Sequence, residues 1–271
     1  MPELPEAETI ARTLAAVLAG ETIRRARLLR RDFLKTGSPR RIARLAGRPL
    51  TAVTRRGKYV LLHAGPYRLV LQLGMSGRVH LARSGEPLPP HTHLVVGFAG
   101  PRQLRVVNAR RIAAGIHLLA DDEPGPMAAL GPDADAIGRA EFVQRLAGRA
   151  GPIKAALLNQ SLLAGVGNIY ADEALFAAGI RPARRVSRIS RRRLARLHGA
   201  VRKVLAEAVA AGGSTLDDAN PFAGADGVLG YFTHFHQVYG RYGQPCPRCG
   251  RTLRRTLVGG RTSTYCPACQ Q

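Results

Sequence analysis

The sequence lacks the features that direct a chain into or across a membrane. No apolar run approaches the ~20 residues that a membrane-spanning helix requires. The chain begins MPELPE, with acids and prolines, whereas secretory and mitochondrial leaders begin with a basic region. We therefore expect a cytoplasmic protein of bacterial type. Internal repeats and low-complexity tracts are also absent, and 271 residues suffice for one large or two small domains.

Acidic residues and lysines are both scarce. The chain has 41 lysines and arginines against 18 acids, a formal net charge of +23. Such a surface attracts polyanions, so nucleic acid is the expected partner. Charge for solubility or a lipid-binding face is the alternative, but the basic residues run through the whole chain. The few lysines therefore mark sites where a compact ammonium is needed; they are Lys35, Lys58, Lys154 and Lys203.

Hydrophobic periodicity predicts a helix followed by a long β region. Residues 5–19 predict the helix, because Pro5 suits its first turn and Ile10, Leu14 and Leu18 share one face. Between 21 and 120, short apolar runs alternate with Gly, Pro and polar residues, as in a sandwich or barrel.

The second half of the chain predicts helices and then a small turn-rich tail. Residues 139–211 have helical patterns, with one helix ending near Ala164, and 217–232 are typical of a loop. We expect an α+β multidomain fold. Its predicted parts are an N-terminal domain (1–120), a linker (121–135), a helical domain (136–236) and a cysteine-bearing tail (237–271).

All the cysteines lie in the tail, as two C-x-x-C pairs with sixteen residues between them: Cys246, Cys249, Cys266 and Cys269. This spacing supplies four thiolates for one tetrahedral, structural Zn²⁺. The segment is too small to form a core without such a staple. Disulfides are the alternative, which a cytoplasmic location disfavours. A hairpin is predicted between the pairs, with Arg261 just past its Gly-Gly tip as surface or as a DNA contact.

The stretch GVGNIYADEALF predicts a tight turn that opens a helix at Asn168. Backbone N–H groups at such a helix start favour a phosphate, to which Lys154 adds a charge. An ordinary helical hairpin with Asn168 as its cap is the alternative.

Together, MPELPE, RRGKY, LGMSG, GVGNIYADEALF and the four-cysteine hairpin resemble the bacterial formamidopyrimidine-DNA glycosylase family over essentially the whole chain. Members excise oxidised purines such as 8-oxoguanine and nick the abasic site. The resemblance implies an N-terminal helix beside a two-sheet β-sandwich, a helix-two-turns-helix domain and a zinc finger. Double-stranded damaged DNA would bind between the halves, so the protein would associate with the nucleoid. We expect a monomer, since no segment resembles an oligomer seam.

The resemblance also implies a catalytic role for the first residues. Removal of Met1 would leave Pro2 as a secondary amine that attacks C1′ of an extruded nucleotide. Glu3 would be the general acid/base and Glu6 would hold the terminus. Lys58 would act in β-elimination and Arg261 in δ-elimination. A plain acidic helix start is the alternative for the terminal residues.

Further positions match DNA contacts of the family. Phosphate or other DNA contacts are implied for His91, Arg149, Lys154 and Asn168. Met75 and Arg110 match residues that fill the space left by the extruded base, although core packing is the alternative for Met75. For His93 we expect a structural role.

Three features depart from the family pattern. The stretch Asn-Ala-Arg-Arg-Ile-Ala (108–113) has Ile112 where an aromatic residue is usual. Asp217, followed by Asp218, stands where the lesion-covering loop usually has a basic residue, and Gln72 replaces a histidine. All three concern recognition of the lesion or its strand, so the preferred lesion and opposite base stay open.

Three other functions compete with this prediction. A sister enzyme of the endonuclease VIII type would act on oxidised pyrimidines. A catalytically altered homologue would only bind damaged DNA. An RNA-binding translation factor with a zinc ribbon would explain the charge but not the intact N-terminal motif.

Overall fold

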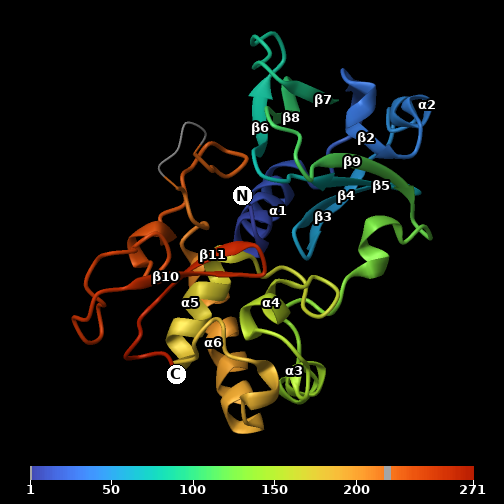
Figure 1. Ribbon diagram of the computed structural model, residues 1–271. Helices are drawn as coiled ribbons and strands as arrows, with labels where there is room; N and C mark the ends of the chain where they lie inside the picture. The colour runs from blue at the N-terminus through green and yellow to red at the C-terminus, as the bar shows by residue number, and fades with distance from the viewer. Residues whose placement is uncertain (1, 217–220) are drawn as a thin grey trace. The chain divides into compact units, whose positions relative to one another are not determined.

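The computed structural model describes residues 2–216 and 221–271 (Figure 1). The predictions for Met1, Asp217 and Asp218 lie outside these residues. The chain forms two compact units. The first comprises the described residues of Met1–Ala128 and Ala211–Tyr231, and the second comprises Ala129–Ala210 and Phe232–Gln271. Among the described helices, none is both long enough and apolar enough to cross a membrane.

The first unit contains helix α1 (Leu4–Leu18) and two β-sheets. In spatial order, the five-stranded sheet consists of β2 (Leu34–Thr36), β9 (Gly115–Ala120), β5 (Tyr67–Gln72), β4 (Tyr59–Ala64) and β3 (Leu50–Arg56). The four-stranded sheet consists of β1 (Ile23–Leu28), β7 (Thr92–Phe98), β8 (Arg102–Asn108) and β6 (Gly77–Arg83). Neighbouring strands are antiparallel except β2 and β9. The short helices are η1 (Arg31–Phe33), α2 (Pro39–Ala43) and, at the end of the first segment of this unit, η2 (Gly125–Ala129).

The core of this unit lies between the two sheets and under α1. Ile10, Leu14 and Leu18 are fully buried, as their helical spacing predicts, and α1 packs on β3 and β4. Alternate residues such as Leu69 and Leu71 in one sheet, and Leu104 and Val106 in the other, join the same core. The predicted N-terminal helix and β-sandwich are confirmed.

A segment from the second half of the sequence packs with the first unit. Ala211–Tyr231 lies within the predicted helical domain, yet the Ser214 N–H donates to Glu6 Oε1 at 2.8 Å. The Leu81 N–H also donates to the Ala225 carbonyl at 2.8 Å, and Ala225 is buried in the sandwich core. The domain boundaries given above remain predictions.

The second unit is helical with one β-hairpin. Helix α6 packs on α3 and α5, while α5 also contacts α4 and β11. Its helices and strands are α3 (Arg139–Leu146), α4 (Ile153–Leu158), α5 (Asn168–Ala178), η3 (Val186–Arg188), α6 (Arg191–Ala210), η4 (Phe232–Phe235), β10 (Arg254–Val258) and β11 (Arg261–Tyr265). The predicted hairpin between the cysteine pairs is confirmed, with Gly259 and Gly260 at its tip.

One predicted helix boundary is wrong. Helix α4 ends at Leu158 rather than near Ala164. The Asn159 side chain accepts hydrogen bonds from the Ser161 N–H and hydroxyl. The Gln160 amide then donates to the Val166 carbonyl and accepts from the Gly165 N–H. These local side-chain bonds replace the helical ones and close a loop in front of α5.

Candidate functional site

The start of α1 is held by a buried carboxylate. Pro2, Glu3 and Glu6 are all buried, and Glu3 is the N-cap residue of the helix. Glu6 Oε2 accepts the Glu3 N–H at 2.7 Å, while its Oε1 accepts the Ser214 N–H at 2.8 Å. Gly213 has a φ of +87°, and a Cβ there would lie 2.8 Å from Glu6 Oε1. Glu6 therefore fixes the peptide that follows Pro2, and its supporting role in catalysis stays a prediction.

The turn that carries Lys58 is tied to the same helix. Gly57 and Lys58 connect β3 to β4, and Gly57 has a φ of +56°, which suits glycine. Arg55 Nε donates to Glu8 Oε2 of α1 at 2.8 Å. Burial acts to raise the pKa of Glu8, but hydrogen bonds and charge from Arg55 and Arg12 lower it overall. Glu8 is thus held as a carboxylate that joins the turn to α1.

The two loops predicted to fill the DNA stack are joined through Asn108. Its buried side chain donates from Nδ2 to the Leu73 carbonyl at 2.8 Å. Its Oδ1 accepts from the Ser76 hydroxyl and the Arg111 N–H, both at 2.8 Å. Ser76 Oγ in turn accepts the Arg110 N–H at 3.0 Å. The Met75 loop and the loop 109–113 therefore form one hydrogen-bonded unit.

The tip of that unit is open to solvent. Ile112 is 54% exposed, Arg110 is exposed and Met75 is half-buried in its turn. Two residues of the loop, Arg111 and Ala113, have positive φ values of 54° and 49°. Non-glycine residues in this region are uncommon and store strain, so the hydrogen bonds from Asn108 hold a conformation that the chain would otherwise avoid.

His91, which immediately precedes β7, and His93, which lies within it, differ in environment. His91 is exposed, with a φ of +63°, and its carbonyl accepts the Asn108 N–H at 3.0 Å. His93 is buried, stacks on Phe33 with ring centroids 4.3 Å apart, and has Nε2 at 2.8 Å from the Asn108 carbonyl. A structural role suits His93, whereas His91 is accessible to a ligand. Gln72 Oε1 lies 3.5 Å from His117 Nε2.

The start of α5 combines a polar side chain with the positive end of a helix. Gly167 is the N-cap residue and Asn168 is the first residue of the helix. The alternative that Asn168 is the cap is therefore wrong. The Asn168 Oδ1 is buried and, within the described part of the chain, has no hydrogen-bond partner. The Asn168 amide and the first-turn N–H groups therefore meet at the end of the helix where an anion is favoured.

Lys154 is fully buried beneath the hairpin. Its Nζ lies 2.8 Å from Asp172 Oδ1 and donates to the Thr262 carbonyl at 3.0 Å. Asp172 also accepts from the Ser263 hydroxyl and, at 3.0 Å, from the Thr264 N–H. Burial raises the pKa of Asp172, against the charge of Lys154. The pair thus holds the strand that begins at Arg261, and the phosphate role of Lys154 stays a prediction.

Arg261 and Arg149 are both exposed. Arg261 is the first residue of β11, next to Thr262, so the buried pair fixes the backbone that presents it. Arg149 follows α3, and its Nε donates to the Arg145 carbonyl.

Glu173, next to Asp172, forms a second anchor for the tail. Its carboxylate accepts the N–H groups of Gln237, Val238 and Tyr239 at 2.8–3.0 Å. Asn108, Asp172 and Glu173 were not singled out from the sequence. The signal for the last two was two adjacent acids inside an apolar helix of a chain with few acids.

The four cysteines converge. The ligand atoms of Cys246, Cys249, Cys266 and Cys269 all lie within 4.8 Å of one another. The Sγ atoms of Cys246 and Cys269 lie 4.0 Å apart and those of Cys249 and Cys266 lie 3.6 Å apart, close to the edge of ~3.8 Å that tetrahedral Zn–S bonds of ~2.3 Å require. Burial and the other three sulfurs raise the pKa of the Cys269 thiol to about 12. A bound cation stabilises the thiolate form and so offsets this unfavourable environment. The residues fit one structural Zn²⁺.

We expect one zinc per chain by metal analysis of protein purified without chelator. Chelation should weaken DNA binding, because the hairpin loses its staple. Circular dichroism and unfolding of the first unit should change little, since its core contains no cysteine. Metal-free protein with all four thiols reduced would refute the assignment.

Comparison with known proteins covers the whole chain. Residues 1–114 match the Formamidopyrimidine-DNA glycosylase N-terminal domain, 129–220 the Formamidopyrimidine-DNA glycosylase H2TH domain, and 243–271 the zinc finger found in FPG and IleRS. The formamidopyrimidine-DNA glycosylase of Cereibacter sphaeroides is 42% identical over 287 residues, covering 100% of both chains. That of Moorella thermoacetica is 44% identical over 266 residues, covering 94% of each.

Solved structures agree in fold. Lactococcus lactis Fpg in complex with DNA containing an abasic site has a TM-score of 0.90 and 32% identity, covering 99% of both chains. A point mutant of Lactococcus lactis Fpg, in complex with DNA containing Fapy-dG, has a TM-score of 0.91 and 32% identity over 100% of both.

Proposed function

Since the chain belongs to the formamidopyrimidine-DNA glycosylase family, it is a bifunctional base-excision repair enzyme for oxidised purines, and we propose that Pro2 is its nucleophile. The enzyme would release the damaged base as a glycosylase and then cleave the DNA at the abasic site as a lyase. The family assignment excludes the translation-factor alternative. The structural neighbours bind damaged DNA, and duplex DNA is the partner that the net charge of +23 favours.

The proposed chemistry begins at the amine exposed when Met1 is removed. An unperturbed α-amino group has a pKa of about 7.7–8.0, so part of Pro2 would be neutral and nucleophilic near pH 7. Its nitrogen attacks C1′ of the extruded nucleotide, the bond from C1′ to the base breaks, and the proton given up by the Pro2 nitrogen goes to the departing base. Glu3 protonates the ring oxygen O4′ as the C1′–O4′ bond opens. The products are the free base and an iminium that joins Pro2 to the open sugar.

The observation that carries this proposal is the double hydrogen bond of Glu6. One oxygen holds the Glu3 N–H and the other holds the Ser214 N–H, so the carboxylate that fixes the peptide after Pro2 is itself anchored. A nucleophile gains rate when its position is fixed in advance. A plain helix start would need only the first of these bonds. Borohydride reduction tests the proposal, because it converts the iminium into a stable amine that joins protein and DNA.

Cleavage of the strand would follow by elimination. The iminium makes the C2′ protons acidic; loss of one proton expels the 3′-phosphate, and a second elimination expels the 5′-phosphate. We assign Lys58 to the first step and Arg261 to the second. The tie from the Lys58 turn to α1, through Arg55 and Glu8, supports the assignment of Lys58.

The remaining residues would bind DNA. The phosphate backbone would be held by the start of α5 at Asn168 and by the exposed Arg149 and His91, and the buried Lys154 would add its positive charge. Met75, Arg110 and Ile112 would enter the stack, where their joined loops keep them together. We further propose that the protein acts as a monomer on nucleoid DNA; sedimentation of the free protein at two concentrations tests the monomer.

Ile112 offers a direct test of the space-filling role. Filling the gap offsets part of the few kcal/mol that base extrusion requires. An aliphatic wedge inserts but does not stack as an aromatic ring does. We expect Ile112→Phe to raise the single-turnover excision rate of 8-oxoguanine opposite cytosine, with Ile112→Leu unchanged as the matched control. No gain, or a loss, would mean that other residues fill the gap.

A panel of oxidised purines and pyrimidines, run on the same variants, tests the endonuclease VIII-type alternative.

A further inference from the structure

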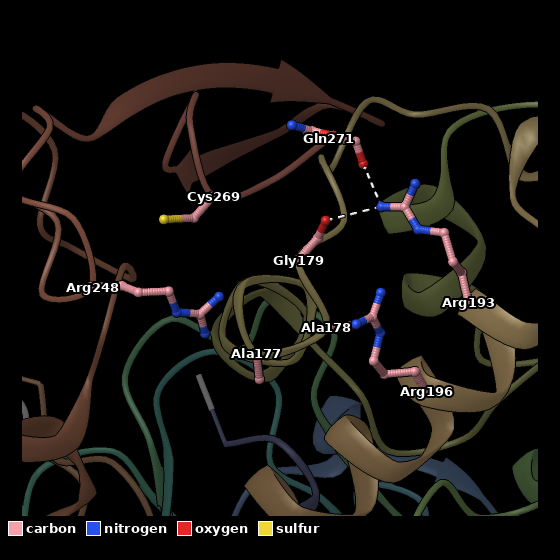
Figure 2. Close-up of a pocket in the computed structure, with 8 residues that line it drawn as sticks. All are labelled: Ala177, Ala178, Gly179, Arg193, Arg196, Arg248, Cys269 and Gln271. Carbon is pink, nitrogen blue, oxygen red and sulfur yellow. Dashed lines mark hydrogen bonds between the residues drawn. The ribbon is translucent and has the colours of Figure 1, made fainter.

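The far end of α5 carries a cluster of arginines that the proposed reaction does not use. Arg193 and Arg196 of α6 and Arg248 of the first C-x-x-C pair line a hollow of about 450 Å³ (Figure 2). Its other lining residues are Ala177, Ala178, Gly179, Cys269 and Gln271. None of these side chains is acidic and three are arginines, so the hollow is positive even with the main-chain oxygens of Gln271 in its lining. We name it the arginine hollow.

Two of the arginines are held in place by the fold. Arg193 Nη2 donates to the Gly179 carbonyl at 3.0 Å and to the Gln271 carbonyl at 2.7 Å (Figure 2). The Arg248 guanidinium lies over the ring of Phe176, 4.5 Å from its centroid. Arg193 therefore caps the end of α5, which gives it a structural reason to be there. Arg196 and Arg248 make no ion pair with the described acids, and the cap does not require them.

The arginines around the hollow repel one another. Burial, together with the positive charges of Arg184 and Arg196, lowers the pKa of Arg193. Helix α6 also begins with Arg191, Arg192 and Arg193 and has no acid in its first turn. Cations at this end of a helix oppose its dipole. A sequence that breaks this local rule without visible compensation points to a function, here a bound anion.

The hollow continues towards the start of α6. A neighbouring hollow of about 370 Å³ is lined by Ser190, Arg192, Arg193 and Arg196, so the two share Arg193 and Arg196. Two adjoining positive hollows suit successive phosphates of a strand better than one small ion. The arginine fork matches phosphate oxygens. The arginine hollow offers little apolar surface for a protein side chain, since its apolar lining residues are Ala177 and Ala178.

We propose that the arginine hollow binds the phosphate backbone of a second DNA duplex. Helix α5 has 11 residues and is therefore ~16 Å long. The proposed phosphate site for the damaged duplex is at its N-terminal end, and the hollow is at its C-terminal end. The free N–H groups at the first end point away from the second, so a strand bound there and a strand bound in the hollow lie at opposite ends of the helix. This inference rests on the proposed DNA interface at Asn168. A second duplex would hold the enzyme near DNA while the first is searched or released.

The stoichiometry of binding to a short undamaged duplex tests the proposal. By sedimentation at low salt and saturating duplex, we expect two duplexes per chain for the wild type and one for Arg196→Gln/Arg248→Gln. The charge-matched control is Arg139→Gln/Arg202→Gln, which changes two exposed arginines of the same unit. This variant should still bind two duplexes per chain. Because Arg248 lies between zinc ligands, Arg196→Gln alone is a second variant. It should lower the salt slope of the second binding step by about one.

Excision of 8-oxoguanine and zinc content, measured on the same samples, should be unchanged. If the wild type did not excise 8-oxoguanine, the proposed function would be wrong. The number of duplexes bound per chain would still test the arginine hollow. A wild type that saturates at one duplex would overturn the proposal, as would equal loss of the second duplex in both double variants. Binding of polyglutamate in place of the second duplex would assign the hollow to an acidic protein instead.

Discussion

Borohydride added during turnover should join this protein covalently to DNA that carries either 8-oxoguanine or a bare abasic site. Both substrates lead to the same iminium between Pro2 and the open sugar, which reduction makes permanent. The mass of the cross-link should map to the N-terminal peptide without Met1. Met1 must be absent, because an uncleaved methionine turns the Pro2 nitrogen into an amide.

Two substitutions separate the roles at the terminus. Pro2→Gly should reduce trapping strongly but not to zero, since glycine still offers a primary amine at the same place. Glu3→Gln should slow base excision by about 10²–10⁴-fold, the usual contribution of a general acid/base. It should retain some nicking of a preformed abasic site, where the bond to the base is already broken. Glu21→Gln, which removes a partly exposed acid that pairs with Arg102 elsewhere in the same unit, is the control and should behave as the wild type.

Protein with a free Pro2 that binds damaged DNA but never traps would contradict the covalent mechanism. That result would favour a homologue that only binds damaged DNA.

Lys154→Met should destabilise the second unit severely. The substitution leaves Asp172 buried without its cation, and breaking such a pair typically costs about 3–5 kcal/mol of unfolding free energy. Removing the charge as well, in Lys154→Met/Asp172→Asn, should recover much of the loss. In the double variant the amide oxygen accepts the Thr264 N–H, which now bonds to Oδ2, and the amide N–H donates to the Ser263 hydroxyl, which can accept as well as donate. Denaturant unfolding of the full chain measures both variants.

The decisive comparison is between the unfolding free energies of the two variants. If the double variant were as unstable as the single one, the uncompensated charge would not be the cause. The salt dependence of DNA binding, measured on folded protein, then tests the phosphate role. If Lys154 contacts a phosphate directly, the salt slope of either variant should be lower than that of the wild type by about one. An unchanged slope with weaker binding would limit Lys154 to holding the hairpin.

The sequence predicted the features that depend on local pattern. Ile10, Leu14 and Leu18 marked the buried face of α1, and the spacing of the cysteines marked the metal site. Features that depend on contacts between distant segments were missed. Lys154 was recognised as unusual, but its partner at Thr262 is 108 residues away, so its burial was not visible. Asn108 joins two loops through Leu73, 35 residues away, a contact that no local pattern indicates.

The double attachment of the tail to α5 matters for an enzyme whose substrate forms under oxidative stress. Oxidants that damage guanine also convert thiolates to sulfenic acids and disulfides, and exposed thiolates react first. Cys249 is exposed, so the metal site is vulnerable when lesions are most frequent. Asp172 and Glu173 hold the hairpin and residues 237–239 through bonds that contain no sulfur. Two separate devices therefore hold this part of the chain. The metal site staples the tail to itself and can be broken by peroxide, whereas the carboxylate bonds tie the tail to α5 and are left intact.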